Sequence, residues 1–240
     1  KGANVMKRFS ADPLLAAVFS VTLAISVYSE AGQTLQLVQV NTDDIPNYLA
    51  WAEEAAPIML EDAAGAIGVC VPRFGAEEQG DVYFYSIAPN MEAFLSLDLN
   101  APNITNETAR IAERRTVVAR DIATVQKSAP TRQAGTSWSQ MSLFVETTQV
   151  GRYVQLLGEQ ETALHENGFE DAHWTVFAIN TGEFTGQIVA NLTAPTGARL
   201  GAALDAVQSA PWSNFVQGSY DGVRTLVNAR LSECEVFAAN

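Results

Sequence analysis

The segments GDVYFYSIAP (residues 80–89) and GQIVANLTAP (residues 186–195) decide the fold, because they carry one pattern at a shift of 106 residues. Each begins at a glycine, continues as an apolar-rich run and ends in Ala-Pro. Glycine and proline interrupt regular structure, so each segment is typical of one strand bounded by turns. Working outward from both segments, we expect the same order of elements twice.

Around the first segment the expected order is strand, helix, strand, strand, helix, strand. Apolar residues recur every three or four positions from Ile45 to Leu60, which predicts a helix, and Gly65 follows its end. The expected strands are 34–42, 66–74, 81–88 and 117–126, with shorter helices at 90–98 and 104–115.

The second half repeats this order. A helical face runs from Val150 to Leu164, and Tyr153 falls at the place of Tyr48 in the first half. The expected strands are 141–148, 172–180, 186–195 and 230–238, with helices at 197–208 and near 212–226. We therefore predict a tandem repeat: residues 32–126, a linker at 127–137 that is rich in structure-breaking residues, and residues 138–240.

Each half has the split βαβ order of a ferredoxin-like sheet. The strand segments VYFY (82–85) and WTVFAI (174–179) do not alternate cleanly between apolar and polar residues. A sheet that is covered on both faces has such strands. We therefore expect an α+β fold in which two fused ferredoxin-like repeats cover each other's sheets and form an intrachain α+β barrel.

Residues 1–31 have the pattern of a signal peptide. Lys7 and Arg8 precede an apolar stretch at 14–28, and an A-x-A-like site ends at Ala31. The stretch is shorter than the roughly 20 residues of a bilayer-spanning helix. We expect cleavage after Ala31 and export to the periplasm or the extracellular space; an uncleaved membrane anchor is the alternative.

The negative net charge of the chain argues against nucleic acids and anionic membranes as partners. The formal net charge is -13, and residues 1–31 hold three basic and two acidic residues, which leaves 11 Lys and Arg against 25 Asp and Glu. Such a surface repels phosphate backbones and offers no basic patch to anionic lipid, so we expect neither a nucleic-acid nor a membrane partner after cleavage.

The only two histidines are eight positions apart and the two cysteines are distant, so we expect no metal site.

The whole arrangement resembles the dimeric α+β barrel superfamily, especially its antibiotic-biosynthesis-monooxygenase-like branch. The most similar local stretch is the strand that is followed by IPNYLAWAEEAAPIML (residues 45–60). The resemblance covers nearly all of the mature chain. It implies relatives among cofactor-independent oxygenases of aromatic substrates, haem-degrading enzymes and proteins without a known activity.

The sequence contains no GxGxxG, P-loop, HExxH or CxxC motif that would identify a reaction. We therefore keep two hypotheses for the function. The first is an exported, non-enzymatic protein that binds a small apolar or aromatic ligand, or a protein partner. The alternative is a cofactor-independent, monooxygenase-like enzyme that acts on such a molecule. His173 is the best catalytic candidate, and core packing is its other interpretation. The candidate ligand-binding residues are Trp174, Tyr83, Tyr85 and Phe177, although aromatic strand residues are more often plain core.

We expect no cofactor. The alternative is haem held by His165, because the chain also resembles haem proteins of the chlorite-dismutase group, which carry an axial histidine on a helix before a strand of the second half.

Cys70 lies in the second strand of the first half and Cys234 in the fourth strand of the second. These are edge strands in a ferredoxin-like sheet, and they meet in a closed barrel. A Cys70–Cys234 disulfide would then stabilise the fold by about 4 kcal/mol, whereas two buried thiols are the alternative. Both a monomer and a homo-oligomer stay open.

Overall fold

The computed structural model describes residues 32–60, 65–213 and 218–240, so the expected signal peptide lies outside the described residues. The elements in chain order are β1 (Thr34–Asn41), α1 (Ile45–Leu60), β2 (Ala66–Phe74), β3 (Asp81–Ala88), α2 (Met91–Leu95), α3 (Pro102–Ile111), η1 (Ala112–Arg114), β4 (Thr116–Lys127), β5 (Ser137–Glu146), α4 (Val150–Glu166), β6 (His173–Ile179), β7 (Ile188–Ala194), α5 (Gly197–Ser209) and β8 (Thr225–Ala239). Within the described ranges, no helix combines the length and the apolar character that crossing a membrane requires.

The strands form one closed barrel in the order β1-β3-β2-β8-β5-β7-β6-β4. The first half contributes the sheet β4-β1-β3-β2, and the second half contributes β8-β5-β7-β6 in the same topological order. Every neighbouring pair is antiparallel, and the halves join where β2 pairs with β8 and β4 pairs with β6. The expected α+β barrel is therefore present, and it is closed within one chain.

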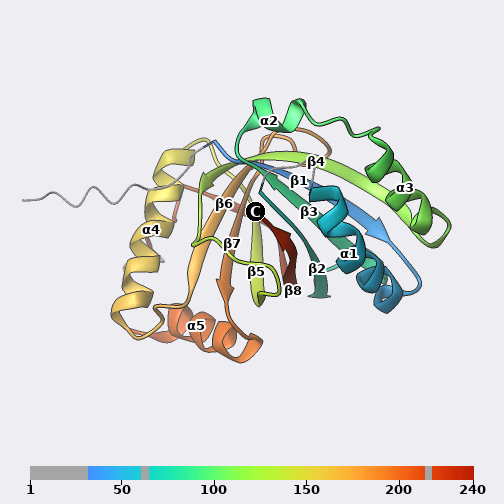
Figure 1. Cartoon of the computed structure of the whole chain (residues 1–240). Coiled ribbons are helices and arrows are strands. Elements are labelled where there is room, and N and C mark those ends of the chain that lie inside the picture. The colour runs from blue at the N-terminus through green and yellow to red at the C-terminus, as the bar shows by residue number, and fades with distance from the viewer. Residues whose placement is uncertain (1–31, 61–64, 214–217) are drawn as a thin grey trace, which may run out of the picture.

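The helices lie on the outside of the barrel, with α1 and α3 beside the first half and α4 and α5 beside the second (Figure 1). Each half has its own core between helix and sheet. Tyr48 on α1 and Tyr153 on α4 are both fully buried and occupy corresponding places in these two cores. The same cores bury aliphatic side chains such as Leu157 and Val40, and such burial stabilises a fold by about 1.5–3 kcal/mol for each side chain.

Both faces of the barrel strands are covered, which explains their unbroken apolar runs. On β3, Val82 and Phe84 pack into the core under α1, whereas Tyr83 and Tyr85 belong to a cluster inside the barrel. Successive side chains of a strand point to opposite faces, so an apolar residue at every position needs two apolar environments. The outer helices supply one of them and the barrel interior supplies the other.

A disulfide joins Cys70 on β2 to Cys234 on β8, with an S–S distance of 2.08 Å. The two residues are directly paired across one of the two seams between the halves. The bond links positions that are 164 residues apart in the sequence. It therefore ties the first half of the chain to the last strand of the second.

Some element boundaries differ from the sequence-based expectation. Strand β8 begins at Thr225 rather than at 230, because it pairs with β5 as far as Glu146. Residues 225 and 226, expected to end the helix near 212–226, therefore belong to this strand. Residues 214–217 of that helix lie outside the described residues. Lys127 and Ser137 belong to β4 and β5, so the connection between the halves is residues 128–136.

Candidate small-molecule site

The barrel interior contains a cavity of about 510 Å³, which both halves enclose. Its volume lies within the range of about 300–1,000 Å³ that small-molecule sites occupy. Most of its wall is apolar, and the apolar lining residues include Leu35, Leu37, Tyr83, Tyr85, Ile87, Ala123, Val125, Trp138, Phe144, Phe177, Ile179, Phe184, Val189 and Val236. The interior is therefore not filled by side chains, and an apolar molecule could enter it.

Aromatic rings from both halves meet in the cavity wall. The rings of Tyr85 and Trp138 lie 6.3 Å apart, edge to face, and those of Phe144 and Phe184 lie 5.8 Å apart. Rings at these separations and tilts leave flat faces and edges that suit another ring system. The wall therefore favours a flat, aromatic molecule over a flexible chain.

Arg132 brings a positive charge to this wall from the connection between the halves. Its guanidinium lies 4.4 Å from the centroid of the Trp138 ring and donates a hydrogen bond to the Thr193 hydroxyl at 2.7 Å. Burial lowers the pKa of Arg132 from its ordinary value. Within the described part of the chain no carboxylate forms an ion pair with it. The Arg132 guanidinium could therefore form an ion pair with an anionic oxygen of a ligand.

A second guanidinium, that of Arg230 on β8, lines another part of the cavity. It lies 4.1 Å from the Tyr83 ring centroid and 5.2 Å from that of Phe144, and only 6% of the residue is exposed. Glu77 approaches it at 3.6 Å and Gly75 accepts a hydrogen bond from its Nε. Burial raises the pKa of the Tyr83 phenol, against the opposing effect of Arg230, so Tyr83 stays neutral.

Asp121 on β4 is the titratable acid of the cavity. It is buried, and its Oδ1 atom has no hydrogen-bond partner in the described structure. Burial, followed by the negative charge of Glu183, raises the pKa of this carboxyl from its usual 3.8. Gly182 lies against it so closely that a Cβ on Gly182 would overlap Oδ1. A buried carboxyl with a raised pKa and an oxygen not engaged in a hydrogen bond can accept and return a proton.

The sequence did not single out Asp121, although a signal was present. Asp121 shares the inward face of β4 with Ala123 and Val125, which have the period of two that a strand face requires. A charged residue in register with an apolar inner face is unusual. The sequence-based candidates are instead the aromatic residues of the apolar strand segments.

The residues that the sequence proposed for the site are divided between two places. Tyr83, Tyr85 and Phe177 line the cavity. Trp174 points the other way from Phe177, and it is buried in the core beneath α4. His173 is not among the lining residues. As the first residue of β6, it contacts Glu161 and His165 of α4 instead.

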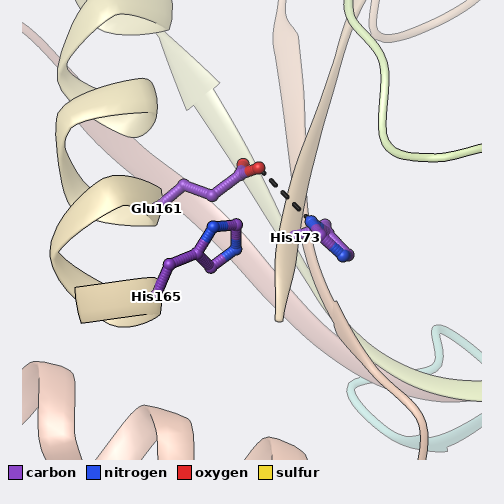
Figure 2. A group of neighbouring side chains, drawn as sticks. All are labelled: Glu161, His165 and His173. Carbon is purple, nitrogen blue, oxygen red and sulfur yellow. Dashed lines mark hydrogen bonds and ion pairs between the residues drawn. The ribbon is translucent and has the colours of Figure 1, made fainter. Parts of the chain in front are cut away.

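His173 belongs to a separate cluster with Glu161 and His165, two residues one turn apart on α4 (Figure 2). His173 Nδ1 lies 3.4 Å from Glu161 Oε1, and the two imidazole rings are 5.2 Å apart, edge to face. One potential ligand atom from each of the three residues lies within 4.8 Å of the other two. The spacing of eight residues between the histidines gave no hint of this contact, because it depends on how α4 sits against β6.

Glu161 also anchors α4 to the seam between β4 and β6. Its Oε2 atom accepts a hydrogen bond from the Lys127 ammonium at 2.7 Å and one from the Trp174 amide at 2.8 Å. Burial would raise the pKa of Glu161, but hydrogen bonds from His173, Lys127 and Trp174, together with the charge of Lys127, hold it below its ordinary value. The carboxylate is therefore ionised at neutral pH.

No protein-family model matches the sequence, and no curated protein matches it. Several solved structures match the fold. A proposed monooxygenase from Lactobacillus acidophilus NCFM has a TM-score of 0.60 at 10% identity, over 87% of this chain and 98% of that one. An anthrone oxidase-like protein has a TM-score of 0.52 at 14% identity, over 87% and 92%.

A haem-binding protein from Thermus thermophilus also matches, with a TM-score of 0.50 at 10% identity, over 85% of this chain and 91% of that one. This match corrects the expectation that the scaffold works without a cofactor, because a protein with the same fold binds haem. Identities this low establish the fold alone. This chain shares the ferredoxin-like α+β-barrel fold of these proteins.

Proposed function

We propose that this protein is a monooxygenase-like enzyme that oxidises a flat, mostly apolar molecule in the barrel cavity. The observation that carries the proposal is the buried Asp121 carboxyl in a largely apolar cavity with an aromatic wall. The enzyme hypothesis now replaces the exported binding protein as the leading one, because the matching folds include a proposed monooxygenase and an anthrone oxidase-like protein.

The cavity suits a ring system that becomes an anion during the reaction. In this proposal Asp121 removes a proton from a ring carbon next to a carbonyl, or from a ring hydroxyl. The negative charge that forms on the substrate oxygen is stabilised by the positive charges that Arg132 and Arg230 bring to the cavity wall. The largely apolar wall lowers the local dielectric constant, which strengthens this attraction.

The electron-rich anion then reacts with molecular oxygen, which is the oxidant of the proposal. For a ring CH₂ group the step balances as substrate plus O₂ giving a ring carbonyl plus water. One oxygen atom enters the new carbonyl and the other leaves as water with the two hydrogens. The carbon loses four electrons and the O₂ molecule gains them. The protein's part is to orient the ring, to move the proton through Asp121 and to hold the anion.

The described residues do not fit haem in the cavity. No histidine, methionine or free thiol is among its described lining residues, and burial raises the pKa of both Tyr83 and Tyr85, which disfavours phenolate ligands. His165 lies outside the barrel, where its Nε2 atom is 2.9 Å from the Ala172 carbonyl. We therefore derive no step through haem.

Two finer assignments are also part of the proposal. The identical element order and sheet order of the halves support a tandem duplication within the antibiotic-biosynthesis-monooxygenase-like branch. The Cys70–Cys234 disulfide supports export, because such bonds persist in oxidising compartments. Residues 1–31 as a cleaved signal peptide would provide the route.

Anthrone is a suitable test substrate, because it is flat, has an acidic CH₂ group next to its rings and gives anthraquinone and water with O₂. We expect the full chain to consume one O₂ per anthrone above the uncatalysed rate. Asp121→Asn should lower kcat by about 10²–10⁴-fold, since it removes the proton acceptor. Asp205→Asn, at an exposed position of α5, is the matched control. Equal rates for Asp121→Asn and the wild type would refute the role of Asp121.

A further inference from the structure

We infer that Glu161, His165 and His173 form a binding site for one divalent transition-metal ion, with Zn²⁺ as the best-suited common ion. The site is separate from the cavity, because none of the three residues lines it. Two imidazoles and one carboxylate are a ligand set that suits zinc and other first-row ions. Three protein ligands leave the remaining positions to water.

The geometry of the cluster is close to that of a bound ion. Bonds of about 2.0–2.1 Å to a tetrahedral zinc place its ligand atoms roughly 3.4 Å apart. The three candidate ligand atoms already lie within 4.8 Å of one another, and His173 Nδ1 is 3.4 Å from Glu161 Oε1. Small side-chain rotations bring the third atom to the same separation, because His165 and Glu161 project from consecutive turns of α4 (Figure 2).

The surroundings orient the ligands in the way that metal sites require. Metal-bound histidines donate their other N–H to a carbonyl or carboxylate, and metal-bound carboxylates are themselves hydrogen-bonded. His165 Nε2 lies 2.9 Å from the Ala172 carbonyl, a contact that fixes the proton on Nε2 and leaves the Nδ1 lone pair for an ion. Glu161 uses Oε2 for Lys127 and the Trp174 amide, and its Oε1 atom faces His173 Nδ1, so an ion between these two atoms would replace their present contact.

The site is reachable from solvent and would link a helix to the barrel. The side chains of Glu161 and His173 are 14% and 21% exposed. An ion held by α4 and by the first residue of β6 would add a direct link between these two elements to the Glu161 contacts that already join them. Lys127 forms an ion pair with the same carboxylate, and its positive charge weakens the attraction for a cation.

Titration calorimetry of the full, tag-free, chelator-treated chain with ZnCl₂ tests the site, with Co²⁺ absorption in the visible range as a second readout. We expect one ion per chain and a rise in Tm with Zn²⁺. Glu161→Gln, His165→Ala and His173→Ala should each weaken binding at least about tenfold. Glu166→Gln, on an exposed position of the same helix, should bind like the wild type.

Lys127→Met provides an independent check, because it removes the cation that competes for Glu161 without changing any of the three ligand residues. We expect it to bind Zn²⁺ more tightly than the wild type. If a histidine variant unfolds, His173→Gln with the Co²⁺ spectrum decides the same question. Wild-type binding no tighter than that of the Glu161→Gln, His165→Ala, His173→Ala triple variant would overturn the inference. This result would leave the cavity reaction untouched, because that is measured separately by O₂ uptake.

Discussion

Cys70 and Cys234 face each other across the seam between the two halves with their Cα atoms 4.0 Å apart. The sequence separation of 164 residues makes this one of the longest loops that the chain could close. In the chain-entropy description, the gain in stability comes from restricting the unfolded chain and increases with loop length. The bond therefore acts on the whole barrel rather than on its local strands.

Removing this bond should lower the free energy of unfolding by about 4–5 kcal/mol. We expect the Cys70→Ser, Cys234→Ser double variant to unfold at a much lower guanidinium concentration than the oxidised wild type. Reduced wild type is the control, because it keeps both sulfur atoms. Coincident unfolding curves for oxidised and reduced protein would contradict the expected role of the bond.

Gly182 and Gly186 form a matched pair within the β6–β7 connection. Both have positive φ values, 85° and 89°, so alanine should strain either position by about 1–2 kcal/mol. A Cβ at Gly182 would collide with Asp121, whereas nothing lies within 4 Å of a Cβ at Gly186. We expect Gly182→Ala alone to lower O₂ uptake with anthrone. Equal activity of the two variants would show that Asp121 tolerates displacement.

The raised pKa of Asp121 predicts how stability depends on pH. The folded protein binds this proton more tightly than the unfolded chain does, so the contribution is fully present below the ordinary pKa of 3.8. It is lost as the pH rises through the raised pKa of the folded state. Asp121→Asn should therefore be more stable than the wild type at neutral pH, with a difference that shrinks as the pH falls toward 3.8. Thermal unfolding across this range measures the effect.

Arg132 should determine the preference of the cavity for anions. We expect 9-anthracenecarboxylate to bind more tightly than 9-anthracenemethanol, because only the carboxylate can pair with the guanidinium. Arg132→Gln should remove this preference, and fluorescence titration measures it. Arg152→Gln, in an exposed ion pair on α4, is the control. A preference that survives in Arg132→Gln would assign it to Arg230.

The architecture could be predicted from local patterns, whereas the polar part of the site could not. The two Ala-Pro-terminated strands and the helix faces through Tyr48 and Tyr153 indicated the α+β barrel, because periodicity records which face is buried. Asp121 and Arg132 gain their roles from distant partners, Gly182 and Thr193, which only the closed barrel brings near. The contact of His165 with His173 likewise depends on the tertiary position of α4.

The closure of the barrel restricts how copies of this chain could associate. Every described strand has a neighbour on both sides along part of its length, but short stretches, such as residues 116–121 of β4 and residues 225–229 of β8, pair with a strand on one side only. Sheet extension, the common route to strand-mediated dimers and fibrils, needs an open row of such groups. Strand-mediated association of the described part is therefore confined to such short stretches, and the barrel offers no open row along a whole strand for sheet growth.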